Sequence, residues 1–146
     1  MPTFERVIPL LVYEDIPAAH DFLVEAFGFE TGGVMRDAAG HAVHGEVRAG
    51  EAPIWLHRVT SEHGLAVADA SSSGLVVYVD DVDAHFKRAR SAGARIDSEP
   101  TDQPYAQREY GARDPEGHRW WFATPVRTIN AEIAEHAENP IGKDRM

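Results

Sequence analysis

The side chains best suited to chemistry in this sequence are two histidines and a glutamate in the first half of the chain. His44 and Glu46 belong to the run VHGEV, and His57 follows Trp55 in IWLH. Residues two positions apart on a strand share a face, so we expect His44 beside Glu46, and His57 beside Trp55. Two imidazoles and a carboxylate can bind zinc or iron, and His44 with Glu46 can act as a metal-free acid–base pair. Hydrogen-bonding polar residues on an open strand are the alternative interpretation.

Two adjacent tryptophans stand in the run DPEGHRWWFATP near the end of the chain. Neighbouring strand residues point to opposite faces, so Trp120 and Trp121 cannot share one environment. We expect Trp120 and Phe122 to fill the core, and Trp121 to face the other side of the sheet. Trp55 occupies the corresponding place in the first half, so the two indoles are expected to oppose one another and stack on a flat or cationic ligand. Two rings that only plug a small cavity are the alternative.

Three further side chains are candidates to contact a ligand. Tyr78 lies in the strand-like run LVVYV, where its hydroxyl either donates to a ligand or is satisfied within the core. Arg108 and Tyr110 are two residues apart and share a strand face. If that face is the open one, they are expected to close the mouth of a pocket.

Composition and charge exclude several classes of protein. The chain has 146 residues, no cysteine and a formal net charge of −10 at pH 7. Without cysteine there is no disulfide and no thiolate nucleophile, and a cytoplasmic location is expected. Nucleic-acid binding needs a basic surface and membrane crossing needs a long apolar run, so neither partner is expected. A small molecule is the expected partner.

The elements that would position these residues occur twice in the same order. A strand over 6–13 leads to Asp15, which is suited to cap a helix from Ile16 to Gly28. A strand over 74–81 ends at Asp81, which is suited to cap a second helix over 82–92. Three strands are expected after each helix, over 31–36, 42–48 and 53–59 and then over 95–98, 107–113 and 119–123. The two caps are 66 residues apart, and this repeat predicts two βαβββ modules.

The expected fold class is α+β. We place the first module over 1–62, a small-residue linker over 63–73, the second module over 74–125, and a polar tail with a short helix around 130–137 over 126–146. Each helix covers one face of its own sheet, so two uncovered faces brought together would form a cupped mixed β-sheet around a cavity, with the helices outside.

Two runs of the sequence resemble a known group of proteins. VYEDIPAAHDFLVEAFGFE and YAQREYGARDPEGHRWWFATP are similar to segments of the vicinal oxygen chelate superfamily, which includes glyoxalase I, extradiol dioxygenases and bleomycin-resistance proteins. The resemblance covers about residues 6–125 and is strongest to bacterial glyoxalase-like and bleomycin-resistance-like members. It implies the two-module fold, and it implies a homodimer whose cavities take strands from both chains.

Enzymes of that superfamily hold a divalent metal with one ligand from each of four strands. The resemblance places those ligands at Ile8, Trp55, Gly74 and Trp121 in this chain. None of these side chains can coordinate such a cation. We therefore expect no metal at the usual site and no cofactor.

The resemblance and the residues together suggest two functions. The first is a metal-free protein that sequesters a flat aromatic or cationic small molecule, as antibiotic-resistance members of the superfamily do. The second is a glyoxalase-like lyase, an isomerase or a dioxygenase that uses a relocated metal or the His44–Glu46 pair.

Overall fold

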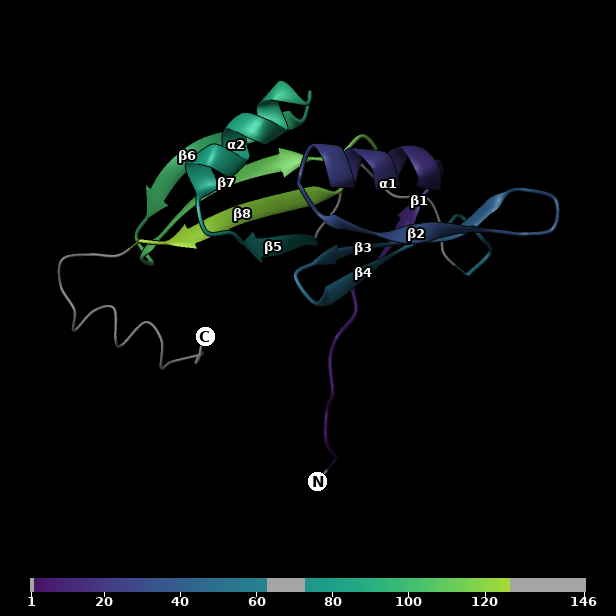
Figure 1. Ribbon diagram of the computed structural model, residues 1–146. Helices are drawn as coiled ribbons and strands as arrows, with labels where there is room; N and C mark the ends of the chain where they lie inside the picture. Colours follow the sequence, from purple (N-terminus) through teal and green to yellow (C-terminus); the bar gives the residue numbers. More distant parts are fainter. Residues whose placement is uncertain (1, 63–72, 127–146) are drawn as a thin grey trace.

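The computed structural model describes residues 2–62 and 73–126 and shows the same βαβββ arrangement twice (Figure 1). The first module comprises β1 (Leu10–Tyr13), α1 (Ile16–Glu25), β2 (Glu30–Arg36), β3 (Ala42–Ala49) and β4 (Ala52–Arg58). The second module comprises β5 (Gly74–Tyr78), α2 (Val82–Ser91), β6 (Arg95–Gln103), β7 (Gln107–Arg113) and β8 (Arg119–Pro125). The tail helix expected over 130–137 and nearly all of the expected linker lie outside the described residues.

The two sheets have the same strand order, and this confirms the predicted α+β fold. The order is β1-β4-β3-β2 in the first module and β5-β8-β7-β6 in the second. The first strand of each module runs parallel to its last strand, with Leu10 paired to Trp55 and Val76 paired to Trp121. Both partners in the second pair follow those in the first by 66 residues, so the structural repeat has the period predicted from the caps.

Each helix begins at the aspartate that the sequence suggested. The Asp15 carboxylate accepts a hydrogen bond from the Ala18 amide at 3.0 Å, and Asp81 accepts one from Ala84 at 3.1 Å. These caps satisfy amides that have no partner within the helix. Gly28, with φ +78°, follows α1 in the left-handed region that terminates many helices.

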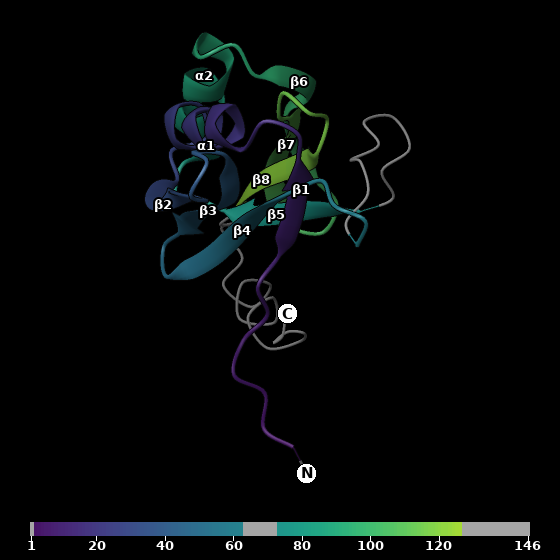
Figure 2. The same cartoon turned by 90° about the vertical axis from the view of Figure 1, so that its right-hand side faces the viewer.

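The first strand is shorter than the expected 6–13. It begins at Leu10, directly after Pro9. Proline lacks an amide hydrogen, so Pro9 pairs only through its carbonyl, which accepts the Trp55 amide at 2.9 Å. In Figures 1 and 2 both helices lie on one side of the two sheets, and the segment before β1 projects from the other side. No helix within the described part of the chain is long and apolar enough to cross a membrane.

The two modules share one hydrophobic core. Phe27 lies between α1 and β2 of the first module, yet its ring contacts Trp120 and Phe122 of the second at centroid distances of 5.6 and 4.8 Å. Arg88 of α2 donates from Nε to the Glu25 carbonyl at the end of α1, at 3.0 Å. An arginine at this position satisfies a carbonyl that the helix leaves open.

The DPEG turn between β7 and β8 fastens the second module to the first. Both carboxylate oxygens of Glu116 accept backbone amides at the start of α1, from Glu14 at 2.7 Å and Asp15 at 2.9 Å. Asp114, which is 3% exposed, accepts the hydroxyl of Tyr13 and, at 3.1 Å, the indole N–H of Trp120. Burial, followed by the charge of Asp114, raises the pKa of Tyr13, so this hydroxyl remains a donor. The acidic residues of the turn therefore hold the module junction.

Candidate ligand-binding site

The side of each sheet that faces away from its helix is here called the open face. On β8, Trp120 and Phe122 are fully buried against the helices, whereas Trp121 is half-buried and points to the open face. The alternation on this strand is the one expected from the sequence.

The indole of Trp121 lies across the sheet rather than standing on it. A Cβ at Gly74 of β5 would collide with Cζ3 of the ring, and a Cβ at Gly111 of β7 would come within 3.2 Å of Nε1. The two ends of the ring therefore rest on glycines of the two strands that flank β8. One ring face is turned to the backbone and the other is turned away from it.

Trp55 is the equivalent residue of the first module. It also lies on the open face, and its Nε1 donates to Oε1 of Glu46 at 3.1 Å. Glu46 forms an ion pair with Arg48 at 2.8 Å. The hydrogen bond from Trp55 to Glu46 fixes the orientation of the Trp55 indole.

The structure brings the expected polar residues of the first module together. His44 is the cross-strand partner of His57, and Glu46 is the cross-strand partner of Trp55. The His44 ring lies edge-on to His57 and to Trp55, at centroid distances of 5.1 and 5.3 Å. These side chains form one continuous polar and aromatic surface.

The residues at the usual metal-ligand positions of the superfamily do not fit a metal. Two of them, Gly74 and Trp121, contact one another, and neither they nor Ile8 and Trp55 offer a suitable donor atom. Among residues 2–62 and 73–126, no three His, Asp or Glu side chains are grouped to hold a metal ion.

Trp55 and Trp121 do not oppose one another within the chain. No ring contact joins them in the described residues, because each lies on the open face of its own sheet.

Tyr78 lies on the open face of the second module, as expected, and is 61% exposed. Its hydroxyl donates to Oε1 of Gln107 at 2.8 Å, and Nε2 of Gln107 donates to Oε1 of Glu109 at 2.8 Å. Tyr105 also donates to Oε1 of Glu109, at 3.0 Å. Partial desolvation and this bond raise the pKa of Tyr105, so its hydroxyl remains a donor.

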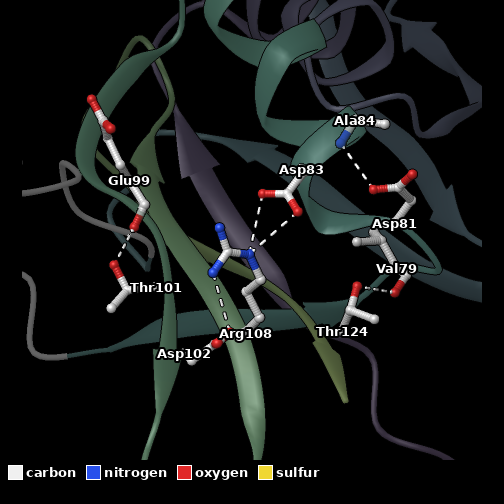
Figure 3. A network of polar contacts seen from close by, with 9 residues as sticks. All are labelled: Val79, Asp81, Asp83, Ala84, Glu99, Thr101, Asp102, Arg108 and Thr124. Atoms are coloured by element: carbon white, nitrogen blue, oxygen red, sulfur yellow. Dashed lines mark hydrogen bonds and ion pairs between the residues drawn. The ribbon is translucent and has the colours of Figure 1, made fainter. Parts of the chain in front are cut away.

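The expectation that Tyr110 closes a pocket mouth is wrong. Tyr110 is fully buried on the helix side of β7, where its hydroxyl lies 2.6 Å from Nδ1 of His85. Arg108 shares that face and lies between Asp83 of α2 and Asp102 of β6, at 3.2 Å from each (Figure 3). Both residues stabilise the helix layer. The residues of β7 on the open face are instead Gln107 and Glu109, which the sequence analysis did not single out.

An apolar cleft of about 590 Å³ lies between the two modules. It is lined mainly by aromatic and aliphatic side chains, with Arg48, His85 and Arg88 as its basic members. Nε2 of His85 donates to the Phe27 carbonyl at 2.7 Å. This histidine therefore belongs to the module junction.

Comparison with known proteins agrees with the fold. A family profile described as the Glyoxalase/Bleomycin resistance protein/Dioxygenase superfamily matches residues 6–122. The chain is 31% identical over 140 residues to the uncharacterized protein Mb0911c of Mycobacterium bovis, covering 92% of each chain.

Two solved structures are similar to the whole two-module arrangement. TioX from Micromonospora sp. ML1 is 31% identical with a TM-score of 0.69, over 84% of this chain and 100% of that one. TnmS3 from Streptomyces sp. CB03234, described as an antibiotic binding protein, is 24% identical with a TM-score of 0.66, over 86% and 99%. Because the family profile matches most of this chain, the chain belongs to the glyoxalase/bleomycin resistance protein/dioxygenase superfamily.

Proposed function

We propose that this protein binds and sequesters a flat aromatic or cationic small molecule on the open faces of its sheets, without a metal. The observation that carries the proposal is the position of Trp121, whose ring spans Gly74 and Gly111 and presents its outer face. A ring already laid flat on a rigid sheet loses little conformational freedom when a second ring stacks on it.

Relatives support a resistance role for this binding. TnmS3 shares the fold and is described as an antibiotic-binding protein. The fold of that relative alone does not specify a ligand, so the support lies in the combination of the shared fold with two tryptophans at the usual metal-ligand positions. Sequestration of a planar antibiotic in the cytoplasm is the form of resistance we propose.

We also propose that the protein is a homodimer. Three apolar or aromatic side chains on the open faces remain largely solvent-exposed in one chain: Met35 (61%), Val76 (55%) and Tyr78 (61%). A second copy can cover these residues and bring the Trp55 face of one chain opposite the Trp121 face of the other. The ligand would then lie between the two indoles.

A second candidate function rests on the first module. His44 contacts His57 next to Glu46, and this arrangement suits acid–base chemistry. A relocated metal would require these side chains to draw closer together, since no three His, Asp or Glu side chains of the described residues are grouped to hold an ion. Elemental analysis separates the candidates, because a zinc, iron or nickel ion bound stoichiometrically and lost in His44→Ala favours the enzyme.

Calorimetric titration with planar polycyclic antibiotics and three-ring probes tests the binding function. Acridone serves as the neutral probe, N-methylacridinium as the cation and anthracene-9-carboxylate as the anion. We expect saturable binding of at least one compound, weakened by Trp121→Ala. The proposal is contradicted if no compound binds at about 1 mM. At that concentration only binding free energies weaker than about −4 kcal/mol escape detection.

A further inference from the structure

The open face of the second module carries a carboxylate, Glu109, that no cationic side chain of the described residues neutralises. We propose that the ligand is positively charged and that Glu109 recognises its charge, an inference that rests on the proposed binding function.

Within the described residues, Glu109 accepts side-chain hydrogen bonds at only one of its two carboxylate oxygens. Gln107 donates from Nε2 and Tyr105 from its hydroxyl, both to Oε1. Tyr78 donates to the amide oxygen of Gln107, and this bond fixes which end of the amide faces Glu109. Oε2 receives no hydrogen bond from the described residues, so it is available to a ligand.

Within the described residues Glu109 forms no ion pair, whereas two other carboxylates on the open faces do. Glu46 pairs with Arg48 at 2.8 Å, and Asp97 pairs with Arg113 at 2.9 Å. In the part of the chain that the structure describes, Glu109 has only neutral donors, from Tyr105 and Gln107. A half-buried carboxylate satisfied only on one oxygen gains stability when a cation binds the other.

Aromatic rings surround this carboxylate. Ala123 of β8 is the cross-strand partner of both Tyr78 and Glu109, and Trp121 is two residues before it. The small side chain of Ala123 leaves space between Tyr78 and Glu109, which Gln107 bridges. Two residues along a strand correspond to about 7 Å. A planar cation of about three fused rings that stacks on Trp121 would therefore extend far enough along the strand to bring its positive charge near Glu109 and the tyrosine rings, whose faces attract positive charge.

Arg119 offers the opposite interpretation, in which the ligand is an anion. It lies two residues before Trp121, and its Nε is buried without a hydrogen-bond partner. That nitrogen is enclosed by protein, whereas Tyr105 beside Glu109 is 60% exposed. The formal charge of −10 also draws cations toward the protein. Arg119 and Glu109 are both half-buried, so the exposed tyrosine and the overall negative charge are what favour a cation.

Charge-matched probes test this inference. N-methylacridinium and anthracene-9-carboxylate have planar three-ring systems of the same size and opposite charge. We expect the cation to bind at least about tenfold more tightly, and Glu109→Gln to reduce its affinity about tenfold, because Gln keeps the acceptor for Tyr105 but removes the charge.

The control variant is Asp21→Asn, which removes the same charge from the outer side of α1, where the Asp21 side chain is 74% exposed. It should leave both affinities unchanged, and circular dichroism should show that both variants are folded. The inference is overturned if the two probes bind with equal affinity, Trp121→Ala weakens the binding of both, and Glu109→Gln weakens the binding of neither. That result would leave the proposed binding function standing. Tighter binding of the anion, lost in Arg119→Gln, overturns it in favour of an anionic ligand. Failure of both probes and of acridone to bind at about 1 mM removes the inference together with the binding function.

Discussion

The six-membered ring of Trp121 rests on the backbone of Gly74, and the contact leaves no space for a Cβ at position 74. Gly74 and Trp121 stand where the resemblance places two metal ligands of the enzymes of this superfamily. In this chain the two residues together form a flat aromatic surface instead. The glycine at position 74 is therefore structurally linked to the tryptophan at position 121, because the ring needs the space that a side chain at position 74 would fill.

Gly74→Ala should displace the indole of Trp121. The new Cβ would meet the ring and lie 3.0 Å from the Arg119 carbonyl, so the ring, being the more mobile group, must move. We expect a changed near-ultraviolet circular dichroism spectrum, a loss of unfolding free energy of about 1–3 kcal/mol, and ligand affinity reduced to the level of Trp121→Ala. Unchanged affinity would show that the flat orientation does not contribute to binding.

The two adjacent tryptophans should respond differently to truncation. Trp120→Ala removes a fully buried ring and the indole donor of buried Asp114, so the free energy of unfolding should fall by about 3–5 kcal/mol. Trp121→Ala should cost about 1 kcal/mol of stability and about 1–3 kcal/mol of binding. Urea denaturation and calorimetric titration measure the two quantities. A reversal of the pattern would place Trp121 in the core.

The sequence was sufficient to predict the features that depend on neighbouring residues. The caps at Asp15 and Asp81 and the opposite faces of Trp120 and Trp121 follow from side-chain chemistry and strand geometry over a few positions. The repeat made the equivalence of Trp55 and Trp121 predictable as well, because both modules use the same register.

Features that depend on contacts distant in sequence were not predictable in the same way. The orientation of β7 follows from its pairing with β8, where Tyr110 is opposite buried Phe122. That pairing places Tyr110 in the core and Glu109 on the open face. The local sequence does not decide which face is buried, because one face carries Arg108 and Tyr110 and the other carries the charged Glu109. The insertion of Phe27 into the core of the other module is a similar case.

Glu116→Ala should loosen the junction between the modules. It removes the acceptor of two amides, from Glu14 and Asp15, at the start of α1. We expect a loss of about 0.5–1.5 kcal/mol of stability and faster hydrogen exchange at those two amides. Glu51→Ala, in the exposed turn between β3 and β4, is the matched control and should change stability by less than about 0.5 kcal/mol. Unchanged exchange at Glu14 and Asp15 would contradict the role of Glu116.

His85 should make stability depend on pH in the mildly acidic range. Its pKa is lowered, chiefly by burial and also by the charge of Arg88, so the folded chain keeps the imidazole neutral where the unfolded chain binds a proton. The contribution of His85 is therefore complete above about pH 6.5 and is lost as the pH falls below that value. Nuclear magnetic resonance titration should give a lower pKa for His85 in the folded chain than in the urea-unfolded chain. The same or a higher value would refute the prediction.

The most direct test of the proposed site uses the indole N–H resonances of the three tryptophans. Trp55 and Trp121 lie on the open faces, and Trp120 is buried with its N–H bonded to Asp114, so Trp120 serves as an internal reference. In a ¹H–¹⁵N titration with the planar probes and antibiotics, we expect the Trp55 and Trp121 signals to shift with a common saturation curve while the Trp120 signal stays in place. A ligand that saturates the protein and shifts Trp120, or none of the three, would show that binding occurs elsewhere and would contradict the account.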